Sequence, residues 1–432
     1  MRSMRSGIGV GIIVGALLLT GCSGGGTNGG GEVDTSLDPA DISGKLSYAI
    51  WDVNQQPGME ALIDDFNKTY PNVKVKIEVT AYAQYFTKLQ TQASSGTLPE
   101  VFWMNGPNFQ LFASNDMLAP LSPLVEADML DTSKYPEALN SMYSLGDEQY
   151  SVPKDFDTIA VYYNREILER AGLEEPTSDW TWDDYRAMAN QITDRLGSEG
   201  IIGTGENYDN QPMLYPAIVS NGGSIIKDGK SGYDDPKTIE AIQFWRDMVA
   251  DGATLTPSQN ADTTGTQRFL NGQAGMVWSG TWQVAPLLDS VVKDKIGVVE
   301  LPLAPSGDRQ TVIHGIGNSM SAKAASDPAA QAFLAYLGSE KAALIQAEMG
   351  TANPAYEGTQ QAFVDSAPAY NLEIFLTAAD EYAQPYPISK NTSAWNKFET
   401  ELLPEAFSGD RPVDEVAKEL AEKMNEALGK EK

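Results

Sequence analysis

Two short segments of the chain place indole rings beside side chains that can bind hydroxyl groups. Residues 51–55 contain a Trp, an Asp, an Asn and a Gln, and residues 278–283 contain two Trp and a Gln. The C–H faces of a sugar ring pack on aromatic rings, and its hydroxyl groups hydrogen-bond to acidic and amide side chains. A single Trp is more often part of a core, but Trp282 lies between Gly280 and Pro286 and should be carried on a loop. The two segments therefore indicate a sugar-binding site.

Residues that could catalyse a reaction form no recognisable set. His314 is the only histidine and Cys22 the only cysteine, so the chain lacks the ligands for a metal site built on these residues. It also has no phosphate-binding loop and no nucleophile elbow near His314. The 59 acidic residues leave a carboxylate pair for sugar hydrolysis open, although Asp155 and Asp157 on an extended segment would point to opposite sides. We expect no enzyme, no cofactor and no metal, with a glycoside hydrolase as the alternative.

The first aromatic segment follows a predicted strand. Residues 46–51 have the apolar run of a buried strand, residues 73–79 alternate apolar and charged side chains, and residues 100–104 predict a third strand. Apolar residues at helical spacing predict helices over 59–66 and 82–94. Strands that alternate with helices pair in parallel, and their ligands bind beyond the carboxyl ends of the strands. The polar residues after residue 51 are therefore in position to contact a ligand.

A second α/β region is predicted after residue 153. Its apolar runs and helical periodicities predict strands over 158–163, 274–279, 295–301 and 314–321, and helices over 182–195, 238–250, 328–337, 341–349 and 413–428. The chain of 432 residues is long enough for two domains, and 42% hydrophobic residues can form their cores.

The N-terminus has the composition of a secretory signal. Two arginines precede an apolar run from residue 8 to 19 that is too short to span a bilayer permanently. Leu19-Thr20-Gly21-Cys22 resembles the lipobox of bacterial lipoproteins, which implies cleavage before Cys22 and a lipid on its sulfur. The alternative is an ordinary secreted protein with an unpaired thiol, which is a liability in an oxidising compartment. We expect residues 1–21 to be a signal peptide and 22–42 a lipidated, Gly-rich flexible linker at the outer face of the cytoplasmic membrane.

The chain is strongly acidic. Its 30 basic and 59 acidic residues give a formal net charge of −29 at pH 7. Such a surface repels nucleic acids and anionic lipid headgroups, so we expect no nucleic-acid partner. It also disfavours phosphorylated ligands weakly.

Short motifs follow one another in a fixed order from residue 51 to residue 387. They are WDxxQ at 51–55, YFTKLQ at 85–90, PEVFWMN at 99–105, VPKDFDT at 152–158, YYN at 162–164, WTWD at 180–183, NGG at 221–223, GQAGM at 272–276, GTW at 280–282, HGIGN at 314–318 and PYP at 385–387. In number and order they resemble the extracellular solute-binding proteins, family 1, of carbohydrate importers of the ATP-binding cassette (ABC) type. Glu100 and Gly275 depart from the Asp and Ala that are usual for the family.

The resemblance implies a two-lobed, periplasmic-binding-protein-like fold of type II. Each lobe would be an α/β unit with a mainly parallel sheet flanked by helices, and the ligand cleft would lie between the lobes. The crossing segments should lie near residues 152–157 and 311–315. The N-terminal lobe would then hold 43–153 plus 314–366, and the C-terminal lobe 154–313 plus 367–432.

The resemblance also implies ligand contacts, residue by residue. Trp51, Gln55, Tyr82 and Asn105 would line the first lobe, Tyr208, Gln211 and Trp282 the second, Asp155 and His314 the crossings, and Glu381 the C-terminal segment. Trp282 would stack on a sugar ring, whereas Asp157 is open between a ligand contact and a buried hinge carboxylate.

The function implied is capture of a mono- or oligosaccharide outside the cell and delivery to an ABC permease, by a monomer. Besides the hydrolase, an importer receptor for another solute and a passive surface adhesin stay open as alternatives.

Overall fold

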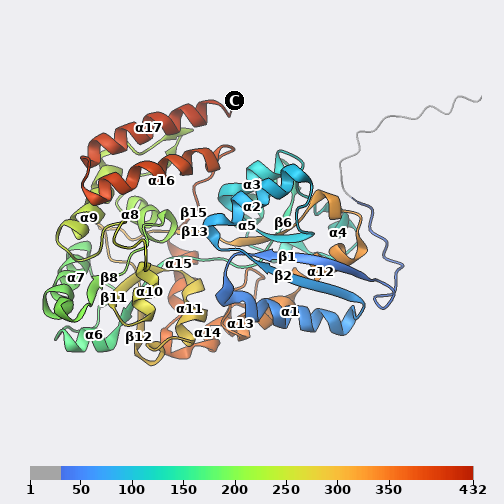
Figure 1. Ribbon diagram of the computed structural model, residues 1–432, viewed down its shortest axis with the longest axis horizontal. Coiled ribbons are helices and arrows are strands. Elements are labelled where there is room, and N and C mark those ends of the chain that lie inside the picture. The colour runs from blue at the N-terminus through green and yellow to red at the C-terminus, as the bar shows by residue number, and fades with distance from the viewer. Residues whose placement is uncertain (1–30, 432) are drawn as a thin grey trace, which may run out of the picture.

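The computed structural model describes residues 31–431, which form two α/β halves arranged side by side (Figure 1). The expected signal peptide and Cys22 lie outside the described residues. Within the described range, no helix combines the length and the apolar character needed to cross a bilayer.

The first sheet contains five strands in the order β2-β1-β3-β14-β6. Their bounds are β1 Gly44–Ile50, β2 Val73–Val79, β3 Val101–Asn105, β6 Ser151–Pro153 and β14 Ile316–Met320. In Figure 1 the helices α1 (Gln56–Thr69) and α13 (Glu340–Glu348) lie below this sheet, and α2 (Tyr82–Ser95) and α3 (Gly106–Ala113) lie above it. The strands β2, β1 and β3 pair in parallel, as their alternation with helices predicts.

Helix α1 illustrates how local sequence determines these elements. Its buried residues Met59, Leu62, Ile63 and Phe66 recur at helical spacing and face the sheet. A proline in its first turn costs no hydrogen bond, because the N–H groups there have no partner within the helix. The helix ends at Thr69, just before the Tyr-Pro pair that disfavours helical backbone.

The second sheet contains four strands in the order β12-β7-β11-β8. Their bounds are β7 Ala160–Asn164, β8 Ile202–Thr204, β11 Ala274–Ser279 and β12 Ile296–Val299. The remaining longer helices of the described chain, in both halves, are α7 (Trp182–Leu196), α9 (Pro236–Ala250), α12 (Pro328–Leu337), α16 (Thr392–Ser408) and α17 (Val413–Gly429). The bounds of β11 and α12 agree with the predicted ranges.

Shorter elements complete the described chain. The helices are α4 Ser122–Glu126, α5 Glu137–Met142, α6 Arg165–Arg170, α8 Tyr215–Ser220, α10 Gly265–Leu270, α11 Val284–Leu288, α14 Gln360–Ser366 and α15 Glu373–Glu381. The strands pair as β4 (Ser144–Leu145) with β5 (Glu148–Gln149), β9 (Ile226–Lys227) with β10 (Lys230–Ser231), and β13 (Thr311–Ile313) with β15 (Ala383–Pro385).

In each sheet one strand runs against its neighbours. β14 is antiparallel to β3 and β6, and β7 is antiparallel to β11 and β12. Ile316, the first residue of β14, pairs with Asn105 at the end of β3, and Ala160 of β7 pairs with Ser279 at the end of β11. A strand that is entered from the edge where the parallel strands end must run the opposite way. The other strands of each sheet share one direction, but the antiparallel strand makes both sheets mixed: β2, β1 and β3 pair in parallel in the first sheet, and β11 and β8 in the second.

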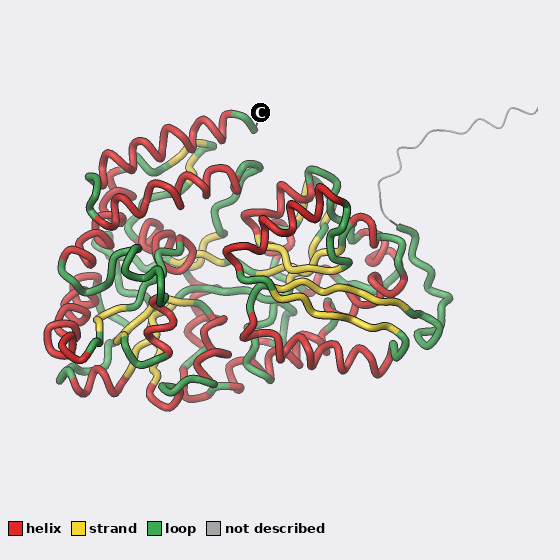
Figure 2. The backbone as a smooth tube through the Cα atoms, in the orientation of Figure 1, coloured by secondary structure: helices red, strands yellow, loops and turns green. Residues whose placement is uncertain are grey.

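Two of the segments that connect the halves lie next to each other between the sheets (Figure 2). Residues 154–157 lead from β6 of the first sheet toward β7 of the second, and residues 314–315 lead from β13 to β14. Asp157 and His314 exchange backbone hydrogen bonds of 2.6 and 3.1 Å. The two connections therefore form a short antiparallel ladder at the boundary of the halves.

A third segment runs beside the first, ahead of residue 366, where the expected lobe bounds imply a third crossing. The N–H of Phe156 donates to the carbonyl of Asn353 at 3.1 Å, and the N–H of Ala355 donates to the carbonyl of Lys154 at 3.2 Å. Before this segment, α13 packs on α1. After it, α14 contributes Phe363 to a buried apolar cluster that includes side chains of β7. Three neighbouring segments of the chain therefore cross the boundary between the halves.

Candidate functional site

A cavity of about 310 Å³ lies between the two halves, where the parallel strands of both sheets end. Its lining residues are Trp51, Asp52, Gln55, Tyr82, Asn105, Pro107, Asp157, Asn207, Asp209, Gln211, Pro212, Ser279, Trp282, Ile316 and Tyr386. They combine aromatic rings with amide and carboxylate side chains. Such a lining suits a ligand with both flat apolar faces and many hydroxyl groups.

The first wall rests on a cluster of aromatic rings around Trp51. The ring centroid of Trp51 lies 5.1 Å from those of Tyr85 and Trp103 in edge-on geometry, and 5.6 Å from that of Tyr82. The buried hydroxyl of Tyr85 lies 3.0 Å from the carbonyls of both Ala49 in β1 and Trp103 in β3. These contacts hold the indole of Trp51 in one orientation before any ligand arrives.

Asn105, the last residue of β3, orients a second ring of this wall. Its Oδ1 accepts a hydrogen bond from the N–H of Asn108 at 3.1 Å and so caps α3. Its Nδ2 donates to the hydroxyl of Tyr82 at 3.1 Å. The hydroxyl hydrogen of Tyr82 is thereby left free to donate to a ligand.

The second wall contains a π-helix, Asn210–Leu214, a rare element that is frequent at functional sites. Asp209 caps it by accepting from the N–H of Gln211 at 3.1 Å. Tyr208 has a left-handed backbone with φ of 56°, its ring packs on Phe407, and its hydroxyl donates to the carbonyl of Leu255. The backbone turn therefore directs Asp209 into the cavity and Tyr208 away from it, contrary to the expected ligand contact of Tyr208.

Gln211 offers this wall an unused donor. Its side chain lines the cavity, and among the described residues its buried Nε2 has no hydrogen-bond partner. A buried amide that lacks a partner is unfavourable by about 1–3 kcal/mol, so a ligand oxygen at this position would be stabilising.

Trp282 packs on a glycine. A Cβ added to Gly280 would lie 2.2 Å from the indole ring, although the backbone of Gly280 has an ordinary φ of −96°. The glycine is therefore required for space and not for its conformation. The ring of Trp282, half buried in this way, lines the cavity opposite the first wall.

Asp157 lines the cavity and also belongs to the first crossing segment. Its Oδ1 accepts hydrogen bonds from the N–H of Thr281 at 3.0 Å and from the Thr281 hydroxyl. Burial, and next the neighbouring charge of Asp155, raise the pKa of Asp157 to about 8. Asp157 therefore occupies both expected positions, because it lines the cavity wall and also belongs to the segment that connects the halves.

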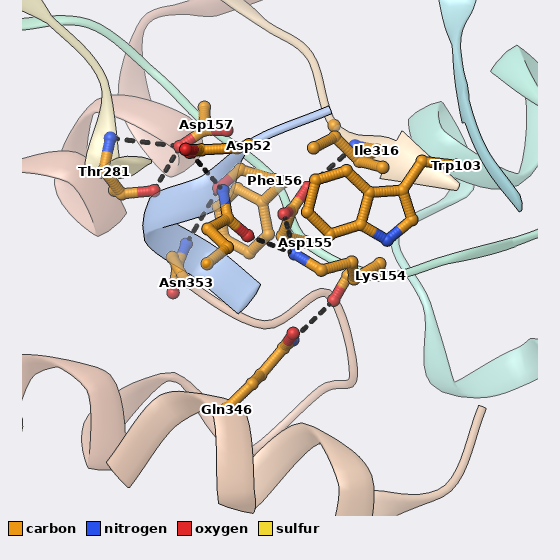
Figure 3. A network of polar contacts seen from close by, with 12 residues as sticks. Asp52, Trp103, Lys154, Asp155, Phe156, Asp157, Thr281, Ile316, Gln346 and Asn353 are labelled. Carbon is orange, nitrogen blue, oxygen red and sulfur yellow. Dashed lines mark hydrogen bonds and ion pairs between the residues drawn. The ribbon is translucent and has the colours of Figure 1, made fainter. Parts of the chain in front are cut away.

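A buried polar network lies behind the cavity (Figure 3). Nζ of Lys154 donates to Oε1 of Gln55 at 2.8 Å and pairs with Oδ2 of Asp155 at 2.6 Å. Oδ1 of Asp155 accepts from the N–H of Ile316 at 2.7 Å, and Nε2 of Gln55 donates to Asp52 at 3.4 Å. Asp155 was expected to bind ligand, but its oxygens face this network and it does not line the cavity.

Two further expected contacts lie off the cavity wall. His314 is buried, its Nε2 accepts from the N–H of Gly106 at 3.3 Å, and its ring lies 4.8 Å from that of Tyr386. Burial lowers the pKa of His314 to about 4, so the imidazole is neutral at neutral pH. Glu381 lies exposed at the end of α15. Within residues 31–431, no three His, Cys, Asp or Glu side chains gather closely enough to hold a metal ion.

The family model for the bacterial extracellular solute-binding protein matches residues 52–344 of the chain. The chain belongs to this family. The arabinooligosaccharide-binding protein of Bacillus subtilis is 26% identical over 69% of this chain and 71% of its own length. The diacetylchitobiose-binding protein DasA of Streptomyces coelicolor is 25% identical over 59% of each chain.

Solved structures of solute-binding proteins share the fold. An ABC substrate-binding protein of Listeria monocytogenes, in complex with cycloalternan, is 24% identical with a TM-score of 0.82 over 90% of this chain and all of its own. The GacH receptor of Streptomyces glaucescens, solved unliganded and with acarbose, is 22% identical with a TM-score of 0.80 over 91% of this chain and all of its own. The two-lobed type II architecture expected from the sequence is thus confirmed.

Of the ligand contacts expected from the resemblance to solute-binding proteins, the structure brings six together in the cavity wall. They are Trp51, Gln55, Tyr82, Asn105, Gln211 and Trp282. Sequence reasoning did not assign Asp52, Asn207, Asp209, Ser279 and Tyr386, which also line it. Asp52 and Ser279 lie within the two aromatic segments, where the signal was available. Tyr386 lies between two prolines in a segment without periodicity, so its direction could not be read.

Proposed function

We propose that this solute-binding protein captures a mono- or oligosaccharide in the cavity between its halves and delivers it unchanged to an ABC permease. The observation that carries the proposal is the composition of the cavity wall. Rings of Trp51 and Tyr82 from one half and of Trp282 from the other line the same cavity, together with amide and carboxyl groups. Sugar rings need both kinds of group side by side.

The named relatives support a sugar as the ligand. Two of them carry names that specify an arabino-oligosaccharide and diacetylchitobiose. Two structural neighbours hold carbohydrate-like ligands, cycloalternan and acarbose. We infer from this agreement that an oligosaccharide is a better candidate for this cavity than a peptide or a phosphodiester.

We propose that the halves act as two hinged lobes. The N-terminal lobe would hold 43–153 plus 314–352 and the C-terminal lobe 154–313 plus 356–432. The third boundary is moved here from residue 366 to the Asn353–Ala355 crossing, because Phe363 packs against β7 of the second sheet. A sugar that contacts both walls would favour the closed arrangement through contacts that the open one lacks, and the permease would recognise the closed lobes.

We also propose a lipid anchor at Cys22, which would hold a monomeric protein at the outer face of the cytoplasmic membrane. The lipobox-like sequence supports it. Substitution Cys22→Ala should release the protein from the membrane fraction of cells that express the full chain. Retention of the variant in that fraction would contradict the anchor without affecting the sugar-binding proposal.

Calorimetric titration with arabino-, malto- and chito-oligosaccharides tests the function. At least one series should bind, and chromatography of the recovered ligand should show its original length. Absence of binding by every sugar would contradict the proposal. Recovery of shortened sugars would instead identify a hydrolase.

A further inference from the structure

The cavity wall carries acidic groups without basic ones. Asp52, Asp157 and Asp209 line it, and none of the described lining residues is a Lys, Arg or His. Asp209 lines the cavity, its Oδ1 accepts from the N–H of Gln211, and it has no cationic partner among the described ion pairs. The wall therefore presents carboxyl groups from both halves, and no basic side chain among the described lining residues, to whatever enters.

The basic groups nearest to this wall do not compensate its charge. Lys154 has a side chain that is 3% exposed, and its ammonium group is already paired with Asp155 behind the wall. His314 is neutral because burial lowers its pKa to about 4. The buried ammonium of Lys154 thus pairs directly with Asp155, and no basic side chain of the described lining residues lies beside the three carboxyl groups of the wall.

The aromatic residues of the wall also favour a cationic ligand over an anionic one. The faces of Trp51, Tyr82, Trp282 and Tyr386 carry negative quadrupole potential, which attracts a cation and not an anion. One such contact already exists beside the cavity, where Nζ of Lys154 lies 4.8 Å from the ring centroid of Trp103. A protonated amine on a bound sugar could make the same contact.

We propose that the cavity selects its sugar by charge: it rejects sugars that bear a carboxylate or phosphate and accepts a protonated amine in place of a hydroxyl group. This inference rests on the proposed sugar-binding function and narrows its ligand to neutral and amine-bearing glycans. A carboxylate brought into the cavity finds no basic group and must share a site of low dielectric with carboxyl groups, whereas an ammonium can pair with them and favours their ionised form. Burial, and next the charge of Asp155, raise the pKa of Asp157 to about 8, so this group releases its proton more readily when a cation lies beside it.

The test compares ligands of one skeleton in three charge forms. Disaccharides of glucose with α-1,4 and β-1,4 linkage are titrated calorimetrically as the neutral sugar, as the glucosamine form and as the form with a terminal uronic acid, at a pH where the amine is protonated. For the linkage that binds, the uronic form should bind at least about 100-fold more weakly than the neutral form. The amine form should bind at least as tightly as the neutral one, and its advantage should shrink at high salt.

Substitution Asp209→Asn provides the matched variant. Asn caps helices as well as Asp does, so the hydrogen bond from Gln211 is retained while the charge is lost. In this variant the ratio of the affinity for the amine form to the affinity for the uronic form should fall by about tenfold, with the neutral sugar titrated in the same series as the reference. Equal affinity for the uronic and neutral forms, or rejection of the amine form, would overturn the inference. Failure of every form and linkage to bind would count against the proposed function itself and so remove the basis of this inference.

Discussion

Oδ1 of Asp157 accepts hydrogen bonds from both the backbone N–H and the hydroxyl of Thr281. Asp157 belongs to the first crossing segment, and Thr281 precedes the indole that lines the second wall. One carboxylate oxygen therefore ties the connection between the lobes to the loop that carries Trp282. A movement of the crossing segment that displaces Asp157 should therefore also displace that loop.

Replacing Thr281 by Val removes the hydroxyl donor and keeps the shape of the side chain. The buried carboxyl of Asp157 then loses one of two donors, which should lower the free energy of unfolding by about 1–3 kcal/mol and weaken sugar binding. Denaturant unfolding and calorimetry measure the two effects. Thr281→Ser keeps the hydroxyl and should recover most of both. If the Val variant matches the Ser variant in stability and affinity, this hydrogen bond has no structural role.

Replacing Gly280 by Ala tests how Trp282 is positioned. The added Cβ would lie 2.2 Å from the indole ring, so the ring must move out of its place in the cavity wall. Sugar affinity should fall at least several-fold, because a ring–sugar stack contributes on the order of 1 kcal/mol or more. Calorimetric titration provides the measurement. Gly429→Ala is the matched control, since its Cβ would meet no atom within 4 Å, and its affinity should equal that of the parent. An unchanged affinity in the Gly280 variant would exclude Trp282 from the ligand contact.

The sequence predicted elements better than side-chain directions, and particular residues show why. The ranges of β11 and α12 follow from apolar runs and helical spacing, which depend on neighbours along the chain. Trp51 and Trp282 line the cavity, and their place could be inferred because each lies shortly after the end of a strand. Their energetic role in binding stays a prediction.

The directions of other side chains depend on backbone geometry and on distant contacts that the periodicity of the sequence does not encode. Tyr208 points away from the cavity because of a left-handed backbone and a following π-helix. Asp155 is turned inward by Lys154, the preceding residue, whose own direction is set by Gln55 from a distant part of the chain. The crossing at Asn353 has no sequence signal of its own, since it pairs through backbone groups alone with residues far away in the chain.

The buried ion pair of Lys154 and Asp155 should be strongly coupled. Lys154→Met leaves the carboxylate buried without a partner, and this should destabilise the protein by about 3–5 kcal/mol. Adding Asp155→Asn removes the stranded charge and keeps an oxygen that can accept from the N–H of Ile316, so the double variant should be more stable than Lys154→Met alone.

Denaturant unfolding of the parent, both single variants and the double variant measures this coupling. The exposed pair of Lys418 and Asp414 serves as the control, with side chains 62% and 55% exposed. Lys418→Met should change stability by less than about 1 kcal/mol. Additive losses in the Lys154 and Asp155 variants would mean that the two charges stabilise the fold independently.

Stability should depend on pH through Glu399, which is fully buried on α16. Its carboxylate accepts from the hydroxyls of Tyr215 and Tyr233 and from the side-chain amides of Asn210 and Asn396. Burial nevertheless raises its pKa from 4.5 to about 7. Between these values the folded state holds a proton that the unfolded state has released, so the free energy of unfolding should fall as pH rises from about 4.5 to about 7. The loss should be on the order of 3 kcal/mol, at 1.36 kcal/mol for each pKa unit.

Glu399→Gln cannot titrate and should therefore remove the contribution of Glu399 to the slope of the stability curve between these pH values, as measured by denaturant unfolding of parent and variant at a series of pH values. Asp65→Asn is the matched control of opposite sign. Hydrogen bonding to Lys341 lowers the pKa of Asp65 to about 2, so its contribution is present above pH 3.8 and is lost as pH falls toward 2. That variant should lower the free energy of unfolding by a constant amount above pH 3.8 and change the slope of the curve only in this acid range. If Glu399→Gln keeps the full slope between pH 4.5 and 7, the buried carboxylate of Glu399 is ionised in the folded protein throughout, and its four donors outweigh its burial.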